Sequence, residues 1–374
     1  MHYFLIKFYF SFSEVGSKHD IDFIKLKLKM AVSLNLNHSS FHPICQNKKY
    51  SFQFIPLSLS IFFENKQMGL FGLLSSINWD SEFYPQLTDF VYLPFFALFF
   101  LFVRLFLDKF IFENLARRLV LGKGHTLHDV QKHDNRKKLN KFKESAWKCI
   151  YFFSSELLSI YVAYGEPWLT NSRYFWEGPG KQVWPDQKIK LKLKAYYTYA
   201  GGFYIYALFA LIFWETRRSD FLVTMVHHIA TIILIVLSYV CRFARVGIVT
   251  LALHEGSDVF LETAKMSKYS GLEWLASVAF VLFALSWTIL RVSLFPFWII
   301  RSTTYEVLLT LDKEKHMVDG SIYYYLFNTL LFCLLVVHIY WWILMIRVIM
   351  RQVKSGGQVD DVRSDSEGED EHED

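Results

Sequence analysis

The chain has 374 residues, of which 53% are hydrophobic and 18% aromatic, and its formal net charge is +5. The apolar residues gather into runs of about 20 residues with few charges, the length that a helix needs to cross the hydrocarbon layer of a membrane. Several such runs exclude an ordinary soluble globular protein and predict an all-α polytopic membrane protein. The four cysteines are scattered and form no CxxC pair, so we expect neither a disulfide framework nor a bound metal.

The two ends of the chain differ from the part between them. Residues 1–67 follow no sustained helical or strand period and lack the cleavage pattern of a signal peptide, so we interpret them as an atypical N-terminal extension, which an incorrect gene model would also explain. The acidic tail over residues 353–374 has almost no apolar side chains, which predicts disorder. Its Ser364 and Ser366 each precede a glutamate by three residues, a pattern that favours phosphorylation, although a purely solubilising tail fits equally well.

Seven membrane-spanning helices are predicted between these ends. The first helix and a basic loop make up residues 68–137, and the other six helices belong to a main membrane domain over residues 138–352. The predicted helices are, in chain order, Phe90–Leu107, Cys149–Tyr164, Tyr196–Trp214, Phe221–Tyr239, Val246–Ala264, Leu272–Phe297 and Tyr323–Met350.

Basic residues predict how these helices are oriented. They follow the first helix in a loop that we place over residues 117–148, and they also follow the third and fifth helices. With alternating topology all three positions lie on one side, which the positive-inside rule makes cytosolic, together with the acidic tail. The basic residues after the third and fifth helices are Arg217, Arg218, Lys265 and Lys268.

The loop between the second and third helices, on the opposite side, is rich in tryptophan. Trp168, Trp176 and Trp184 lie in it, and tryptophans near helix ends are typical of an aromatic belt at the lipid headgroups. Stacking on a sugar or a base is the alternative interpretation. The loop also holds several lysines, which the topology rule would not place on this side.

A histidine pair lies inside the fourth predicted helix, where an ionisable side chain is costly and is therefore a candidate for function. His227 and His228 point about 100° apart on a helix, yet both can flank one cavity. Because the imidazole changes its charge near neutral pH, such a pair suits a general base or a nucleophile. Substrates that reach it from within the bilayer would be lipids.

A second polar cluster lies on the fifth predicted helix. Four of its residues recur at spacings of four, four and three, which places them on one helix face: His254, Asp258, Glu262 and Lys265. Because only a short turn joins the fourth and fifth helices, we expect the two clusters to face each other. An aspartate beside an imidazole would fix its tautomer and stabilise its charged form. A polar network that merely locks two helices together is the alternative, whereas a di-iron site would need more clustered histidines than the chain has.

The residues from His227 to Met266 resemble the Lag1 motif of the ceramide synthases, which belong to the TLC-domain superfamily. The likeness rests on the histidine pair, Ser238-Tyr239, Ala244–Gly247, Leu253–Asp258 and Glu262–Met266, and it extends over residues 138–352. Residues 68–119 resemble the first membrane helix of plant longevity-assurance homologues. Since no homeobox-like insert is present, the chain is similar to plant members of the family.

This resemblance implies a barrel of six helices, the second to the seventh, around a lipid tunnel. It implies transfer of a fatty acyl group from acyl-CoA to the amine of a sphingoid base in the endoplasmic reticulum, with His227, His228 and Asp258 as catalytic residues. Glu255 stands where relatives often have Asp, so the charge at this position is kept. A non-enzymatic lipid-handling or translocation-associated member of the superfamily is the alternative.

The same resemblance sets expectations for ligands and partners. Acyl-CoA would be a co-substrate, with no permanently bound cofactor and no nucleic acid, and the chain could form a homo- or heterodimer with family members. The phosphates of coenzyme A would meet the basic cytosolic surface. We expect these contacts from Arg217, Arg218 and Lys268.

Overall fold

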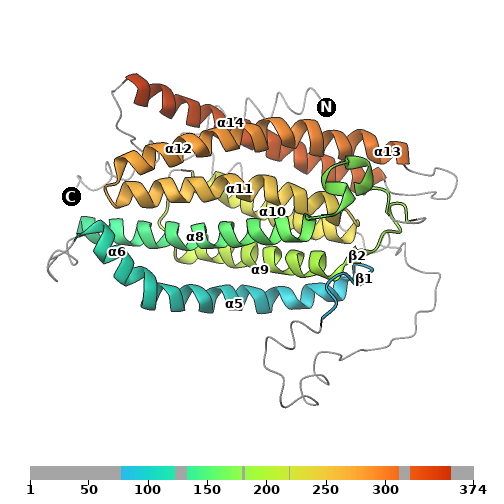
Figure 1. Ribbon diagram of the computed structural model, residues 1–374, viewed down its shortest axis with the longest axis horizontal. Helices are drawn as coiled ribbons and strands as arrows, with labels where there is room; N and C mark the ends of the chain where they lie inside the picture. The colour runs from blue at the N-terminus through green and yellow to red at the C-terminus, as the bar shows by residue number, and fades with distance from the viewer. Residues whose placement is uncertain (1–76, 123–132, 179–181, 219, 311–320, 355–374) are drawn as a thin grey trace, which may run out of the picture. The chain divides into compact units, whose positions relative to one another are not determined.

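The computed structural model describes residues 77–122, 133–178, 182–218, 220–310 and 321–354 (Figure 1). The predictions for residues 1–67 and for the acidic tail, including the phosphorylation of Ser364 and Ser366, therefore lie outside the described residues. All the described residues belong to one compact unit, which begins at Leu74.

Seven long helical segments make up most of this unit, as the apolar runs predict. The first begins with a 3₁₀ turn at Leu87–Val91 and continues as α5, a π-helical stretch at Asp108–Phe112 and α6. The sixth continues from α12 through π-helical turns at Thr288–Ile300 and Ser302–Glu306 into α13. The bounds are α5 Tyr92–Leu107, α6 Glu113–Val120, α8 His133–Ala163, α9 Leu191–Phe213, α10 Phe221–Val240, α11 Ala244–Tyr269, α12 Glu273–Trp287, α13 Val307–Thr310 and α14 Ser321–Lys354.

Six of these segments close into a ring of neighbours. Helix α8 packs on α9, α9 on α10, α10 on α14, α14 on the segment that begins as α12, α12 on α11, and α11 again on α8. The predicted six-helix barrel, built from the second to the seventh helix, is thus confirmed at the level of helix packing. Helix α5 lies outside the ring against α9 (Figure 1). A Cβ on Gly202 of α9 would overlap Phe96 of α5, so glycine permits this close approach.

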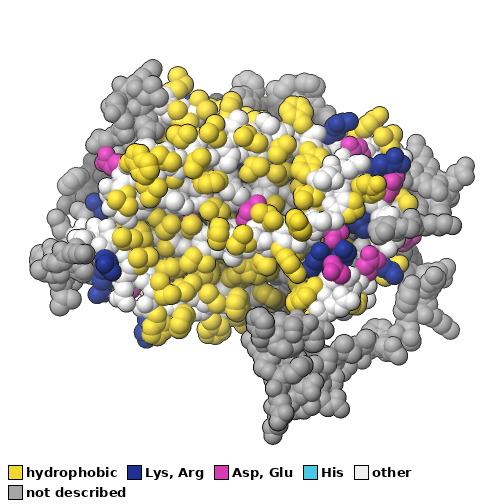
Figure 2. All heavy atoms as spheres, viewed as in Figure 1, with side chains coloured by type: hydrophobic (Ala, Val, Ile, Leu, Met, Phe, Trp, Pro, Cys, Tyr) yellow, Lys and Arg dark blue, Asp and Glu magenta, His cyan; other side chains and the backbone are white. Residues whose placement is uncertain are grey.

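The outer surface matches a bilayer. Figure 2 shows apolar side chains over the middle of the visible face and charged ones gathered toward its two ends. By length and hydropathy, five of the seven segments could cross a membrane. The other two, α8 and α11, carry more charge, but they occupy the ring and place buried acids such as Glu255 and Glu262 inside the protein. The structure thus has the architecture of an all-α polytopic membrane protein.

The prediction of one basic loop from residue 117 to residue 148 is wrong at its C-terminal end. Helix α8 already begins at His133, so the lysines of this stretch lie on a helix. They are tolerated there because neighbouring elements supply acids: Lys143 lies 2.9 Å from Glu113 of α6, and Lys148 lies 2.5 Å from Glu215 after α9. The number of basic residues along this stretch predicted a loop. Ion pairs with acids of other elements allow the same residues to form a helix.

The tryptophan-rich segment forms a cap on one end of the ring, where α11 begins, and the prediction of an aromatic belt at the headgroups is wrong for it. Trp168 and Trp176 are buried, and the indole of Trp176 donates a hydrogen bond of 2.9 Å to Ser302. The guanidinium of Arg245 donates to the backbone carbonyls of Tyr174 and Glu177 and so fastens the cap to α11. The short strand β2 (Ile189–Lys190) of this segment pairs antiparallel with β1 (Glu82–Phe83).

Ion pairs join the cap to the strand that precedes the first helix. Lys190 and Lys192 both contact Asp80 and Glu166 at 2.7–3.4 Å. The hydrogen bond that Lys190 donates to Glu166, together with the charge of Asp80, raises the pKa of Lys190 above its ordinary value. Several lysines on this side, which the topology rule did not explain, are therefore structural partners of acids within the cap.

Candidate active site

The histidine pair lies on α10, less than two turns from its first residue. This helix is rich in Leu, Ile and Val, so its outer face can meet lipid while the two imidazoles turn toward the ring. The imidazole of His228 lies 5.8 Å from the ring of Tyr204 on α9, and that of His227 lies 5.4 Å from Trp341 on α14. Both Nδ1 atoms are buried without a hydrogen-bond partner among the described residues. The two histidines therefore face different neighbours.

A narrow cavity opens beside His227. Its volume of about 40 Å³ leaves room for about three water molecules. Four helices of the ring line it: Tyr204 of α9; His227, Thr231, Leu234, Ile235 and Ser238 of α10; Gly247, Thr250, Leu251 and His254 of α11; and Phe327, Leu331 and Leu334 of α14. The predicted meeting of the two polar clusters is thus realised by His227 and His254.

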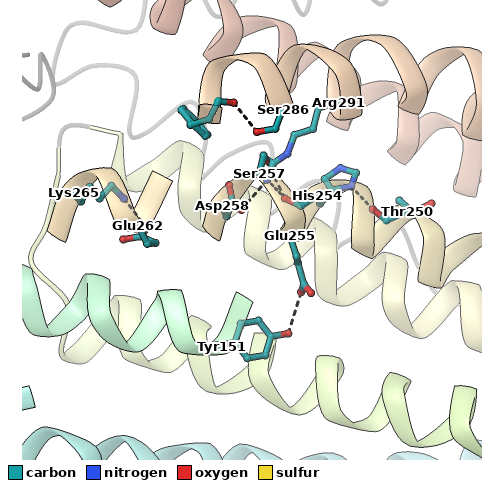
Figure 3. A network of polar contacts seen from close by, with 11 residues as sticks. Tyr151, Thr250, His254, Glu255, Ser257, Asp258, Glu262, Lys265, Ser286 and Arg291 are labelled. Atoms are coloured by element: carbon teal, nitrogen blue, oxygen red, sulfur yellow. Dashed lines mark hydrogen bonds and ion pairs between the residues drawn. The ribbon is translucent and has the colours of Figure 1, made fainter. Parts of the chain in front are cut away.

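The imidazole of His254 is fixed by its own helix. Its Nδ1 lies 2.5 Å from the carbonyl oxygen of Thr250, one turn earlier (Figure 3). Because a carbonyl can only accept a hydrogen bond, Nδ1 carries the hydrogen, and Nε2 of the neutral ring is left as an acceptor. That Nε2 is buried without a partner among the described residues. His254 thus presents a hydrogen-bond acceptor in an otherwise largely apolar region.

Asp258 is held by an arginine. Its carboxylate lies 2.8 Å from Arg291, on the π-helical stretch after α12, and only 2% of Arg291 is exposed (Figure 3). The same guanidinium donates a hydrogen bond to the backbone carbonyl of His254. Asp258 therefore forms its ion pair with Arg291. The sequence suggested a direct contact between Asp258 and an imidazole, but among the described residues Asp258 has no hydrogen bond or ion pair with a histidine.

Glu255 points away from the histidines. In Figure 3 its side chain reaches toward α8, where the hydroxyl of Tyr151 donates a hydrogen bond of 3.0 Å to it. Tyr196 of α9 donates a second one at 3.5 Å. Glu255 is fully buried. It therefore joins α11 to α8 and α9, on a different face from His254 and Asp258.

The far end of α11 meets the basic end of the ring. Glu262 pairs with Lys265 at 2.7 Å, as their predicted common face requires (Figure 3). Burial alone would raise the pKa of Glu215, but the ion pair with Lys148 outweighs it and leaves the pKa below its ordinary value. His228 lies within electrostatic reach of both Lys148 and Glu215.

The three basic residues expected to contact coenzyme A lie at this same end. Arg217 is exposed and its guanidinium stacks over the ring of Phe221 at 5.3 Å. Arg218 and Lys268 are half-buried. In the part of the chain that the structure describes, no group of three His, Cys, Asp or Glu side chains has the arrangement of a metal site.

Two residues of the site escaped the sequence reasoning. Arg291 and His338 are both ionisable, both lie inside predicted membrane helices and both are buried. The ring of His338 lies 4.5 Å from that of His254. The rule that singled out the histidine pair, namely that an ionisable residue within the membrane is a candidate for function, would also have found them. Neither has another charged residue or histidine within eight positions, and only residues that cluster along the chain were considered in the sequence reasoning.

Comparison with known proteins identifies the family of this chain. The family described as TLC domain matches residues 141–347. The chain is 64% identical to ASC1-like protein 1 of Oryza sativa, over 81% of this chain and 97% of that protein. It is 60% identical to Ceramide synthase 1 LOH3 of Arabidopsis thaliana, over 82% of this chain and the whole of that protein. It is also 31% identical to human Ceramide synthase 5, over 63% of this chain and 57% of that protein.

Proposed function

Because the chain belongs to the TLC-domain family, we propose that it acts as a ceramide synthase, an acyltransferase that joins the acyl group of acyl-CoA to the amine of a sphingoid base. Its close likeness to plant ceramide synthases names the reaction. The structural observation that carries the proposal is the convergence of His227 and His254 on one cavity within the ring.

The reaction requires a group that handles protons. The amine nitrogen forms a bond to the thioester carbonyl, the bond from carbon to sulfur breaks, and the departing thiolate takes a proton as the amine loses one. A neutral imidazole can accept the proton of the amine and pass it on. No resident cofactor is needed for these steps, and acyl-CoA enters as a co-substrate.

His227 is the residue that meets the substrate, since it lines the cavity. As a general base it would take the proton of the attacking amine. As a nucleophile it would first displace coenzyme A to form an acyl-imidazole. The amine would then attack this acyl group and release the imidazole. Incubation of the protein with acyl-CoA alone separates the two routes: intact mass spectrometry detects an added acyl group only in the second.

His228 has a supporting role in this proposal. It packs against Tyr204 and lies close to Lys148 and Glu215, at the basic end of the ring. Asp258 acts at a distance as well: Arg291 ties its carboxylate to the backbone of His254. The pair thereby holds the histidine of α11 in place beside the cavity.

The basic end of the ring is the proposed entrance for acyl-CoA. Arg217, Arg218 and Lys268 lie there, together with Lys265, and coenzyme A brings several phosphate charges. Reversal of charge at Arg217, the exposed member, is expected to raise the KM for acyl-CoA and to leave the KM for the base unchanged. An unchanged KM for acyl-CoA would refute this entrance.

The proposal also covers where the protein lies in the cell and whether it forms a dimer. The endoplasmic reticulum, a cytosolic C-terminus and a homo- or heterodimer with family members all agree with the basic residues and the family. Protease protection of a C-terminal epitope tag in sealed microsomes tests the topology. Crosslinking of two differently tagged copies tests the dimer.

The central experiment expresses the full chain in a membrane that lacks ceramide synthase. Wild-type protein should form N-acylated base from acyl-CoA, and His227→Ala and His228→Ala should each lose most of this activity. Val226→Ala is the matched control, because Val226 precedes the pair on α10 and is 55% exposed on the outer surface. Inactive wild-type protein would favour a lipid-handling role, and full activity of both histidine variants would exclude the proposed site.

A further inference from the structure

A third buried histidine stands behind the proposed active site. His338, on α14, is 0% exposed, and neither of its ring nitrogens has a hydrogen-bond partner among the described residues. Burial of a polar group without a partner is costly, and the cost is greater inside a membrane protein, where water is scarce. Leucine or phenylalanine would fill this place without that cost. The histidine therefore suggests a role for its ring nitrogens.

The nearest ring is that of His254. The two imidazoles lie 4.5 Å apart at an interplanar angle of 54°, and Phe295 and Trp287 enclose His338 from the sides. The charged or titratable groups within its electrostatic reach are His254 of α11, His227 of α10 and Arg291 of the segment after α12. His338 is thus in contact with one cavity-lining histidine and close to the other.

The hydrogen-bonding needs of the two rings are complementary. His254 donates from Nδ1 to its own helix, so its Nε2 has to accept a hydrogen. A neutral His338 has one N–H to donate and one nitrogen that accepts. Its donor can meet Nε2 of His254 directly after a small rotation of the ring, or through one water molecule.

We propose that His338 is a positioning residue for the acylation reaction, which holds His254 in one tautomer and orientation beside His227. Without it, Nε2 of His254 would lack a donor, and the ring would be restrained only by its bond to the Thr250 carbonyl. This inference rests on the proposed ceramide synthase function, and it adds a histidine of α14 to the histidines and charged side chains that α10, α11 and the segment after α12 contribute.

The test uses two variants of the full-length protein in the synthase-null membrane. His338→Phe keeps an aromatic ring and removes both nitrogens, whereas His338→Gln keeps a donor and an acceptor. We expect kcat to fall about tenfold in His338→Phe, the size of effect expected when one hydrogen bond that positions His254 is lost. The KM for acyl-CoA should stay unchanged, and His338→Gln should recover most of kcat. Rates are normalised to folded protein by fluorescence-detected gel filtration.

A double variant shows whether His338 acts through His254. In a His254→Phe background, the further change His338→Phe should have almost no effect, because the ring that it positions is gone. Met345→Leu is the control, because Met345 is also buried on α14 but is itself an apolar side chain with no hydrogen bond to lose. Its activity should match the wild type.

Three results would overturn the inference. The first is His338→Phe with kcat within twofold of the wild type. The second is His338→Gln as impaired as His338→Phe in folded protein, which indicates a role in packing. The third is effects that multiply in the double variant. Each is distinct from failure of the proposed function, in which the wild-type protein itself forms no N-acylated base.

Discussion

Replacement of Arg291 by methionine should strongly destabilise the protein. The guanidinium is 2% exposed and lies 2.8 Å from the carboxylate of Asp258. At an effective dielectric constant of about 20, two unit charges at this distance attract each other by about 6 kcal/mol. Removal of one partner of a buried pair costs about 3–5 kcal/mol, because the remaining charge is left uncompensated. The hydrogen bond from Arg291 to the carbonyl of His254 is lost as well.

A double variant separates the charge from the packing. Arg291→Met combined with Asp258→Leu removes both charges and keeps similar volumes, and such replacements of a buried ion pair are often neutral. We therefore expect the double variant to recover most of the stability that the single variant Arg291→Met loses. N-acylation activity should not return, since neither new side chain can hold the backbone of His254.

The assay is thermal unfolding in detergent, followed by fluorescence-detected gel filtration. A loss of about 3–5 kcal/mol corresponds to a fall of roughly 6–20 °C in the apparent Tm of a domain of this size. Arg301→Met is the matched control, because Arg301 lies on the same helical segment but is exposed. Its Tm should stay within about 2 °C of the wild type, as for most surface substitutions.

Two outcomes would refute the reasoning. If Arg291→Met unfolded at the wild-type temperature, the ion pair would contribute nothing to folding. If the double variant were as unstable as Arg291→Met, the loss would come from packing or from the contact with the His254 carbonyl, and Asp258 would not depend on Arg291.

Contacts elsewhere in the ring give three further predictions. Gly247→Ala should lower stability by about 1–3 kcal/mol, measured as Tm, because its new Cβ would overlap the hydroxyl of Tyr197; a Tm equal to that of the wild type would show that Tyr197 moves aside freely. Glu215→Gln should cost about 2 kcal/mol at pH 7 by breaking the pair with Lys148. Because the pKa of Glu215 is lowered in the folded protein, its contribution to stability is present above the unfolded pKa and is lost as pH falls through the folded pKa. The stabilities of the variant and the wild type should therefore converge in acid. A difference in stability that stayed constant with pH would contradict the assignment. Trp176→Phe should cost about 1 kcal/mol through the lost indole hydrogen bond, seen as earlier proteolysis within the cap, and unchanged proteolysis would count against it.

The number and order of the helices could be predicted because each apolar run is long and bounded by charge. The helix Phe221–Val240 illustrates this, because its 20 residues contain few charges and are long enough to cross the hydrocarbon layer. The start of α8 could not be predicted, because Lys143 and Lys148 depend on acids that are distant in the sequence, Glu113 and Glu215. Pairing across elements is invisible to a rule that counts charges along one segment.

The site was predictable in its residue types and only partly in its contacts. The spacing of the polar residues on α11 correctly placed His254 on the face that meets His227, and Glu262 beside Lys265. It could not tell that Asp258 would pair with Arg291, since that partner comes from a helix whose rotation is set by packing. The roles of the histidines in catalysis stay predictions.

The tryptophan cap has a consequence for the membrane itself. A ring of helices with ionisable residues inside it could conduct protons or other ions down their gradients if both of its ends were open. At one end, however, Trp176 is fully buried and packs edge-on against Phe243 at 5.2 Å, with Phe175 buried beside it. These packed aromatic rings close the capped end of the ring. If acyl-CoA enters at the opposite end, as proposed above, the cap would keep the bilayer electrically insulating while the charged substrate is bound.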